Sequence, residues 1–354
     1  MRAIILFVAS GIIFLAGCAT PGPPLPPSRG IPAPITDLQA ARKGDTVILS
    51  WGTPRETTDG ELIRKPGTMV VARAAGSGFQ DIAQVPLPRA LEEKRPEKAT
   101  ATDSLSSLLQ QPASDFAVYQ ITSVGIRGRK SETSNQVSVP LVRTAKPPAG
   151  LQLGLSPEGV SISFDPGWRG DLGNRLNAQY VLRLMRRVEG SQEAAKVSEV
   201  RPGNSAMAIV DRGIEWEKSY TYWITPVTYW EGEGEKGEVE GEDSPPATIL
   251  AHDTFPPATP QGLQAVNSGL PDQPFIDLTW SPNTEPDLAG YNVYRLTDNQ
   301  RWIRINNETV KTPAFKDSTV QPGQQYAYAV AAVDVRGNES ARSEQASESV
   351  PPKQ

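Results

Sequence analysis

Apolar and polar residues alternate in three runs that recur at a spacing of about 113 residues. Each run ends on an aromatic residue. The runs are Val47, Leu49 and Trp51, then Val160, Ile162 and Phe164, and then Ile276, Leu278 and Trp280. Because successive side chains of a β-strand point to opposite faces, each run places its apolar residues on one face. The pattern therefore predicts three strands whose closing aromatic side chain lies in a hydrophobic core.

Further features repeat after each of these strands. A second strand is expected at 69–73, 180–184 and 291–295, and an aspartate recurs as Asp103, Asp211 and Asp317. Nine residues after the last two aspartates, Tyr220 and Tyr326 open further aromatic strands. Short strands separated by turn residues, without an amphipathic helix of useful length, are typical of a β-sandwich.

The third copy resembles bacterial fibronectin type III domains. The resemblance is carried by Trp280, by the run 287–295, by 320–326 and by 332–340. Tyr326, like Tyr220 in the second copy, resembles the tyrosine corner of the family, whose hydroxyl bonds to nearby backbone.

This resemblance extends over about residues 34–352 and implies an all-β chain. We expect three tandem fibronectin type III-like (immunoglobulin-like) β-sandwiches at 34–142, 146–250 and 256–352. The first copy diverges from the pattern. Ala117 stands in place of the corner tyrosine, a charged insertion occupies about 86–100, and the segment after Asp103 is longer, so the middle strands of this copy are expected to depart from the pattern.

The first twenty residues combine a short positive start, an apolar stretch and small residues. This order is typical of a signal peptide. The run Leu15-Ala16-Gly17-Cys18 resembles the bacterial lipobox, which implies cleavage before Cys18 and its acylation by lipid, palmitate included. We therefore expect a signal peptide at 1–17 and a lipidated Cys18 with a Pro-rich stalk at 18–33; the alternative is an uncleaved membrane anchor. Ala19, where an aspartate favours inner-membrane retention, implies the outer membrane, with the domains facing the periplasm or the cell surface.

Composition narrows the possible functions. With 38% hydrophobic and 21% charged residues the chain is globular, and a net charge of −5 argues against a nucleic-acid partner. The lone cysteine excludes an intrachain disulfide, and the lone histidine, His252, lies in a Pro-rich connector. This inventory lacks the base of the common catalytic triads and the usual zinc ligands. We expect a protein that is not an enzyme and holds no cofactor or metal.

The most unusual segment is Tyr229-Trp230 followed by the run 231–243, in which seven acidic residues face one lysine. Alignment of the copies makes it the F–G loop of the second domain. The B–C loop at the same end of that domain contains Trp168, Arg169 and Asp171. One hypothesis is an exposed aromatic patch, formed by Trp168, Tyr229 and Trp230, that binds a partner beside an acidic arm.

The alternative is a solvated, mobile loop whose aromatic residues pack on their own domain. Arg169-Gly170-Asp171 also matches an integrin-recognition tripeptide. The alternative is that Arg169 and Asp171 are ordinary charged loop residues and that Gly170 serves a turn.

Together these features predict a lipid-anchored, non-catalytic cell-envelope protein. Its tandem domains would be presented for interaction or adhesion, with a protein or a glycan as partner, besides the membrane lipid that holds Cys18. Two alternatives remain open, an accessory carbohydrate-binding protein and a structural spacer subunit of an envelope complex.

Overall fold

Strands dominate the computed structural model of the chain. The structure describes residues 30–353 except 93, 95, 168–175, 204, 233, 271 and 298–299. The expected signal peptide and Cys18 lie outside these residues, as does most of the expected stalk. The last stalk residues are described, and there the Ala33 amide donates a hydrogen bond of 2.8 Å to the Glu56 carbonyl.

Contacts divide the chain into two units. The first contains the residues up to Arg143 with the described parts of Gly173–Ala178 and Trp230–Val239. The second contains Thr144–Leu172, Gln179–Tyr229 and Glu240–Gln354.

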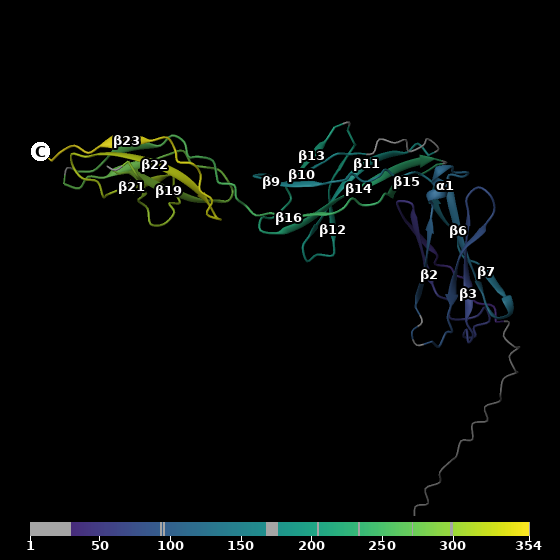
Figure 1. Cartoon of the computed structure of the whole chain (residues 1–354). Coiled ribbons are helices and arrows are strands. Elements are labelled where there is room, and N and C mark those ends of the chain that lie inside the picture. The colour runs from purple at the N-terminus through teal and green to yellow at the C-terminus, as the bar shows by residue number, and fades with distance from the viewer. Residues whose placement is uncertain are drawn as a thin grey trace, which may run out of the picture. The chain divides into compact units, whose positions relative to one another are not determined.

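The first sandwich, in the first unit, has two sheets (Figure 1). One sheet pairs β1 (Gln39–Lys43), β2 (Thr46–Gly52) and β5 (Lys98–Ser104). The other contains β4 (Gln80–Leu87), β3 (Gly67–Ala74) and β6 (Phe116–Val124), and along β6 run β7 (Lys130–Thr133) and β8 (Val137–Pro140). A short 3-10 helix, Ile126–Gly128, joins β6 to β7.

The divergent part of the first copy keeps its sandwich strands. The charged insertion connects β4 to β5, and the extra residues after Asp103 form the short helix α1 (Ser106–Gln110). Leu105 and Leu109 are buried, which anchors this helix to the core of the first sandwich.

The second sandwich repeats this strand order. One sheet contains β9 (Gln152–Ser156), β10 (Gly159–Phe164) and β13 (Met207–Asp211). The other contains β12 (Ala194–Val200), β11 (Gln179–Val188), β14 (Ser219–Gly232) and β16 (Ala247–Leu250).

The expected acidic F–G loop is largely strand. β14 continues to Gly232, β15 (Glu235–Glu240) begins three residues later, and the two strands pair with each other as a hairpin. Within the first unit, β15 pairs with the edge strand β1.

The third sandwich has the same order again. One sheet contains β17 (Gln264–Asn267), β18 (Ile276–Thr279) and β21 (Ala314–Asp317). The other contains β20 (Trp302–Arg304), β19 (Leu288–Leu296), β22 (Gln325–Asp334) and β23 (Ala346–Ser349).

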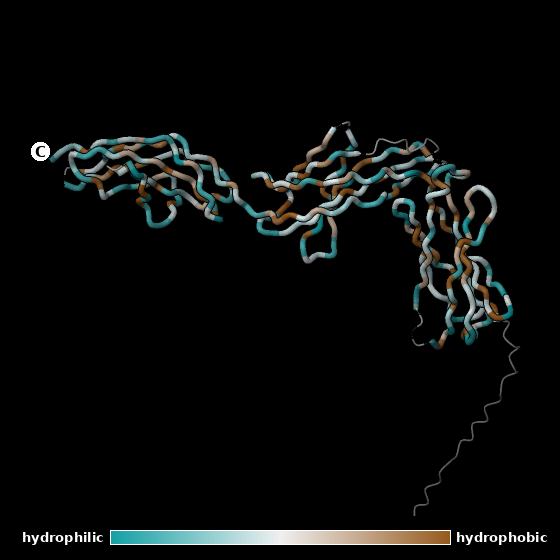
Figure 2. The backbone as a smooth tube through the Cα atoms, viewed as in Figure 1, coloured by the Kyte–Doolittle hydropathy of each residue, from teal (hydrophilic) through white to brown (hydrophobic). Residues whose placement is uncertain are grey.

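Each sandwich encloses its own hydrophobic cluster. All nine residues of the three alternating runs are buried, including Trp51, Phe164 and Trp280 at 1%, 3% and 5% exposure. In Figure 2 the hydrophobic colour follows strands such as β3 and β6 and gives way to hydrophilic turns. In every copy the first, second and fifth strands form one sheet and the others the second. The chain is therefore all-β, with fibronectin type III-like sandwiches as expected.

Candidate functional site

Trp230 lies inside the first unit rather than on a surface. It is 8% exposed, and its ring meets Phe116 edge to face with centroids 5.4 Å apart. Val142, Leu176 and Val239 complete this apolar cluster. The hypothesis that Trp230 belongs to an exposed patch is therefore wrong, because the β14–β15 hairpin carries this side chain into a cluster built by residues distant in sequence.

The other predicted recognition residues divide into two groups. Trp168, Arg169 and Asp171 belong to the stretch 168–175 and lie outside the described residues, so their role stays a prediction. Tyr229 is 37% exposed on β14. Its hydroxyl lies 3.3 Å from Glu199 Oε1 and 3.4 Å from Arg183 Nη2.

Arg183 organises a charged group around Tyr229. Its Nε donates to Glu199 Oε1 at 2.6 Å and its Nη1 to Glu240 Oε1 at 3.1 Å. Burial acts to raise the pKa of Glu199, but the hydrogen bond and charge of Arg183 outweigh it and lower that pKa. Arg183, Glu199, Tyr229 and Glu240 are called the Arg183 cluster below. On the outward face of the β12–β11–β14 sheet the cluster exposes the Tyr229 phenol and part of Glu240, whereas the Arg183 side chain is only 13% exposed and holds them in place.

The recurrent aspartates have a different role. Each lies between an arginine of the third strand and a tyrosine of the sixth, in sets that share one geometry. The sets are Arg73–Asp103–Tyr119, Arg186–Asp211–Tyr222 and Arg295–Asp317–Tyr328. The Arg-to-Asp distances are 2.7, 2.8 and 2.7 Å, and the Tyr-to-Asp distances 2.8, 2.9 and 2.9 Å.

The electrostatics of these sets are those of structural ion pairs. Burial and the adjacent carboxylate raise the pKa of Tyr119, Tyr222 and Tyr328 far above the ordinary value. The phenols therefore stay protonated and donate to the aspartates. A general acid or base works best with a pKa near the working pH, which these phenols do not have.

The tyrosine corners form as expected in two copies. The Tyr220 hydroxyl accepts from the Glu215 amide at 2.7 Å and donates to the Glu215 carbonyl at 3.1 Å. The Tyr326 hydroxyl accepts from the Gln321 amide at 2.8 Å. In the first copy Ala117 occupies the corresponding place and is fully buried.

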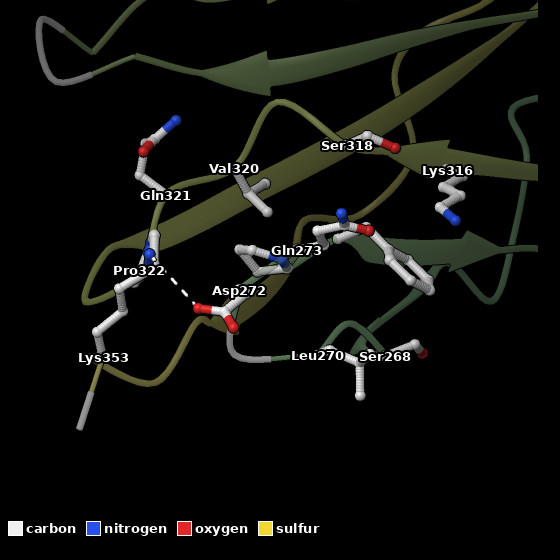
Figure 3. A pocket seen from close by; sticks show the side chains of 12 residues that line it. Ser268, Leu270, Asp272, Gln273, Lys316, Ser318, Val320, Gln321, Pro322 and Lys353 are labelled. Atoms are coloured by element: carbon white, nitrogen blue, oxygen red, sulfur yellow. Dashed lines mark ion pairs between the residues drawn. The ribbon is translucent and has the colours of Figure 1, made fainter.

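A hollow of about 570 Å³ opens at one end of the third sandwich (Figure 3). Lys353 Nζ and Asp272 Oδ1 lie 3.7 Å apart across it, and Lys316 Nζ lies 3.5 Å from the centre of the Phe275 ring. Because these charged groups already contact one another or an aromatic ring, the hollow offers little unmet charge to a ligand.

The described residues therefore form an all-β protein of fibronectin type III-like sandwiches. Among the described residues no helix is long and apolar enough to cross a membrane.

Comparison with known proteins adds little detail. No family model matches the chain. The crystal structure of chicken CNTN1 FN1-FN3 domains is similar at 15% identity over 90% of this chain and 99% of that chain, with a TM-score of 0.25. An Fn3-like protein from Clostridium thermocellum is 29% identical over 28% of this chain and 97% of that chain, with a TM-score of 0.23. At such scores the fold assignment depends on the strand order, the separate cores and the corner hydrogen bonds of the chain itself.

Proposed function

We propose that this chain is a lipid-anchored, non-catalytic protein of the bacterial cell envelope whose sandwiches bind a protein partner. The observation that carries the proposal is the run Leu15-Ala16-Gly17-Cys18 after an apolar stretch. Several acyl chains on one cysteine attach a protein durably to a membrane, whereas one chain gives marginal binding. Ala19 favours the outer membrane as the site of attachment.

The Pro-rich segment after Cys18 would set the sandwiches at a distance from the lipid. Proline favours the extended polyproline II conformation, which rises about 3.1 Å per residue. A stalk of about fifteen such residues reaches roughly 45 Å. This reach leaves room for a partner between membrane and sandwiches.

A non-catalytic role agrees with how the described titratable groups are used. The tyrosines with the most strongly raised pKa values belong to the Arg–Asp–Tyr sets inside the sandwiches. His252 is largely exposed in a connector, with Nδ1 2.8 Å from Glu217 Oε2. Neither arrangement brings a nucleophile and a base together as acyl-transfer chemistry requires.

A protein partner is favoured over a glycan by the position of Trp230. Sugar recognition was expected to use exposed aromatic rings, and this ring is buried against Phe116. The Arg183 cluster instead offers the exposed Tyr229 phenol beside the partly exposed Glu240 carboxylate, a polar surface that suits a protein partner. A glycan array on which the chain binds strongly would reverse this preference.

Lipidation is tested by the mass of the chain recovered from bacterial membranes. We expect the chain to begin at Cys18 and to carry acyl chains, and Cys18→Ser to leave an unmodified chain that fails to partition into detergent. An unmodified wild-type chain would refute the anchoring.

Partner binding is tested by crosslinking in intact cells followed by capture of the lipidated chain. A recurrent protein partner, reduced in yield by Arg183→Glu but not by Arg129→Glu, would support the proposal. The spacer alternative would be favoured if no protein were captured. It would also be favoured if both variants captured the same single partner equally well and in fixed stoichiometry.

A further inference from the structure

A second hollow, of about 360 Å³, lies in the second unit where the second sandwich, the connector and the third sandwich meet. Two aromatic rings stand in its wall, Trp216 and Phe255, with centroids 6.0 Å apart at an angle of 51°. Four prolines extend the apolar wall, and Asp253, Glu285 and Asp287 supply its polar part. We call this hollow the joint pocket.

Negative charge at the joint pocket exceeds the positive charge that faces it. One carboxylate oxygen each from Asp253, Asp287 and Asp334 lies within 4.8 Å of the others, and Asp253 and Asp334 are only 3% and 2% exposed. Among the described residues, Arg336 forms an ion pair with one of these aspartates, with its Nη1 3.6 Å from Asp253 Oδ2. The same guanidinium also reaches Glu217, with Nε 3.3 Å from Oε1.

The three aspartates differ in how well they are satisfied. Asp334 accepts hydrogen bonds from the Asn338 amide at 2.8 Å and from Asn338 Nδ2 at 2.7 Å. Asp253 accepts one from the Phe255 amide at 3.1 Å. Within the described part of the chain, Asp287 receives no hydrogen bond to its carboxylate, although it lines the joint pocket. A buried or half-buried carboxylate without a partner gains most from an added cation.

The walls decide what kind of cation fits. Aromatic rings attract ammonium and guanidinium groups through their faces, and prolines offer apolar surface for a methylene chain. The side chains of the aromatic residues and prolines supply no oxygen ligands, whereas calcium and magnesium need six or more. A pocket with carboxylates beside rings and prolines therefore matches a side chain that is apolar along its stem and positive at its tip.

We propose that the joint pocket binds a lysine or arginine side chain presented by a protein partner. The stem would lie against Trp216 and Phe255, and the charged tip would meet Asp287 and Asp253. The proposal rests on the proposed function, because it names the chemistry by which a protein partner is recognised.

The test uses the full chain with ¹⁵N-labelled tryptophan indoles. Of the seven tryptophans, Trp216 is assigned by loss of one signal in Trp216→Phe. The probes are the capped peptides Gly-Gly-Lys-Gly-Gly and Gly-Gly-Arg-Gly-Gly, with a norleucine peptide of the same length as the uncharged match. We expect the two cationic peptides to shift the Trp216 signal saturably and the norleucine peptide to leave it in place.

Variants locate the charge that matters. Asp287→Asn should lower the affinity for the lysine peptide about 10-fold or more, as expected for the loss of a charge-assisted hydrogen bond. Asp287→Glu should retain most of the binding. Asp272→Asn, at the hollow of Figure 3, is the matched control and should change nothing. Unshifted signals from the other indoles show that each variant is folded, and a fall in affinity with added salt checks the charge independently.

Three outcomes overturn the proposal. One is an equal shift with the norleucine peptide, and the second is unchanged affinity in folded Asp287→Asn. The third is saturation of the Trp216 shift by calcium with exclusion of the lysine peptide, which would make the pocket a metal site. If Asp287→Asn captured the partner from cells as well as wild type, this inference would fall and the proposed function would stand. If the peptides bound but no partner were captured, the pocket would stand as a cation site and the proposed function would fall.

Discussion

Replacing Asp317 by alanine tests whether the Arg–Asp–Tyr sets hold the sandwiches together. The Asp317 side chain is 2% exposed and accepts hydrogen bonds from Arg295 Nη1 at 2.7 Å and from the Tyr328 hydroxyl at 2.9 Å. Thr319 adds bonds from its amide at 2.9 Å and from its hydroxyl at 2.7 Å. Removing the carboxylate leaves a guanidinium and a phenol without their anion.

The expected loss is about 3–5 kcal/mol in the free energy of unfolding of the third sandwich, the cost of breaking one side of a buried ion pair. The lower end applies, because the Arg295 side chain keeps 19% exposure to solvent and a bond of 2.7 Å to the Thr319 hydroxyl. Domain stabilities are typically about 5–15 kcal/mol, so this single change removes a large fraction.

The assay is hydrogen exchange at core amides of the third sandwich, such as those of Val293 and Val330, in the full chain. A loss of 3 kcal/mol makes exchange about 150-fold faster when exchange follows global opening. Asp277→Asn is the matched control, since this aspartate lies opposite Lys316 on the outer face of the same sheet. Such an outer pair is worth about 0.2–1 kcal/mol, which limits the control to an increase of about fivefold.

Acid should narrow the difference in stability between wild type and Asp317→Ala. Burial acts to raise the pKa of Asp317, but bonds from Thr319 and Tyr328 and the charge of Arg295 lower it below the ordinary value. A carboxyl whose folded pKa is depressed stabilises fully above its unfolded value of about 3.9. The contribution is lost as pH falls through the folded pKa, so the gap should narrow below about pH 4.

Exchange in Asp317→Ala that matches Asp277→Asn at neutral pH would refute the reasoning. It would mean that the repeated aspartates are tolerated in the core rather than stabilising it.

Three further changes probe other parts of the fold. Tyr220→Phe removes both bonds to Glu215 and should cost the second sandwich about 1–3 kcal/mol, measured by exchange at its core amides. Gly290→Ala should cost about 2 kcal/mol or more in denaturant unfolding, because its φ is +145° and an added Cβ would lie 2.3 Å from the Val310 carbonyl oxygen. Trp230→Ala empties the apolar cluster of the first unit and should cost about 3–5 kcal/mol, seen as faster exchange along β15.

Two of these changes have a matched control. Tyr229→Ala alters the preceding, exposed residue and should leave exchange along β15 within a few-fold of wild type. Gly154→Ala adds a Cβ where no atom lies within 4 Å and should be neutral or stabilising. If Trp230→Ala behaved like Tyr229→Ala, the burial of Trp230 would be contradicted, and a neutral Gly290→Ala would contradict the tight approach at that glycine. If the second sandwich of Tyr220→Phe were as stable as that of wild type, the hydroxyl bonds of Tyr220 would not contribute to its stability.

Much of the fold could be predicted because its signals are local. Alternation within one strand decides which side chains share a face, whatever the strand packs on. Trp51, Phe164 and Trp280 were therefore assigned to cores correctly. The corner tyrosines were identified by their resemblance to the fibronectin type III pattern, and their partners lie five residues away in sequence.

Register between strands could not be obtained in this way. The sequence comparison aligned the strand 180–184 of the second copy with 291–295 of the third, so that Leu184 corresponded to Arg295. In the structure Arg186 lies opposite Tyr222 as Arg295 lies opposite Tyr328, so the true correspondence is shifted by two residues. A shift of two residues preserves an alternating pattern, so alternation alone cannot detect it. In the second copy Arg186, the partner of Asp211, therefore lay outside the predicted strand.

What the sequence by itself determined is the set of core side chains, which follows from alternation along each strand. The fibronectin type III-like class and the tyrosine corners came from the resemblance of the repeated motifs to that family. Only the tertiary structure decided that Trp230 is buried against Phe116, that Arg183 gathers Glu199 and Glu240, and that Trp216 meets Phe255 at an acidic pocket. The physical reason is that burial and charge pairing depend on which distant segments fill the space beside a side chain. A strand pattern contains no information about that space.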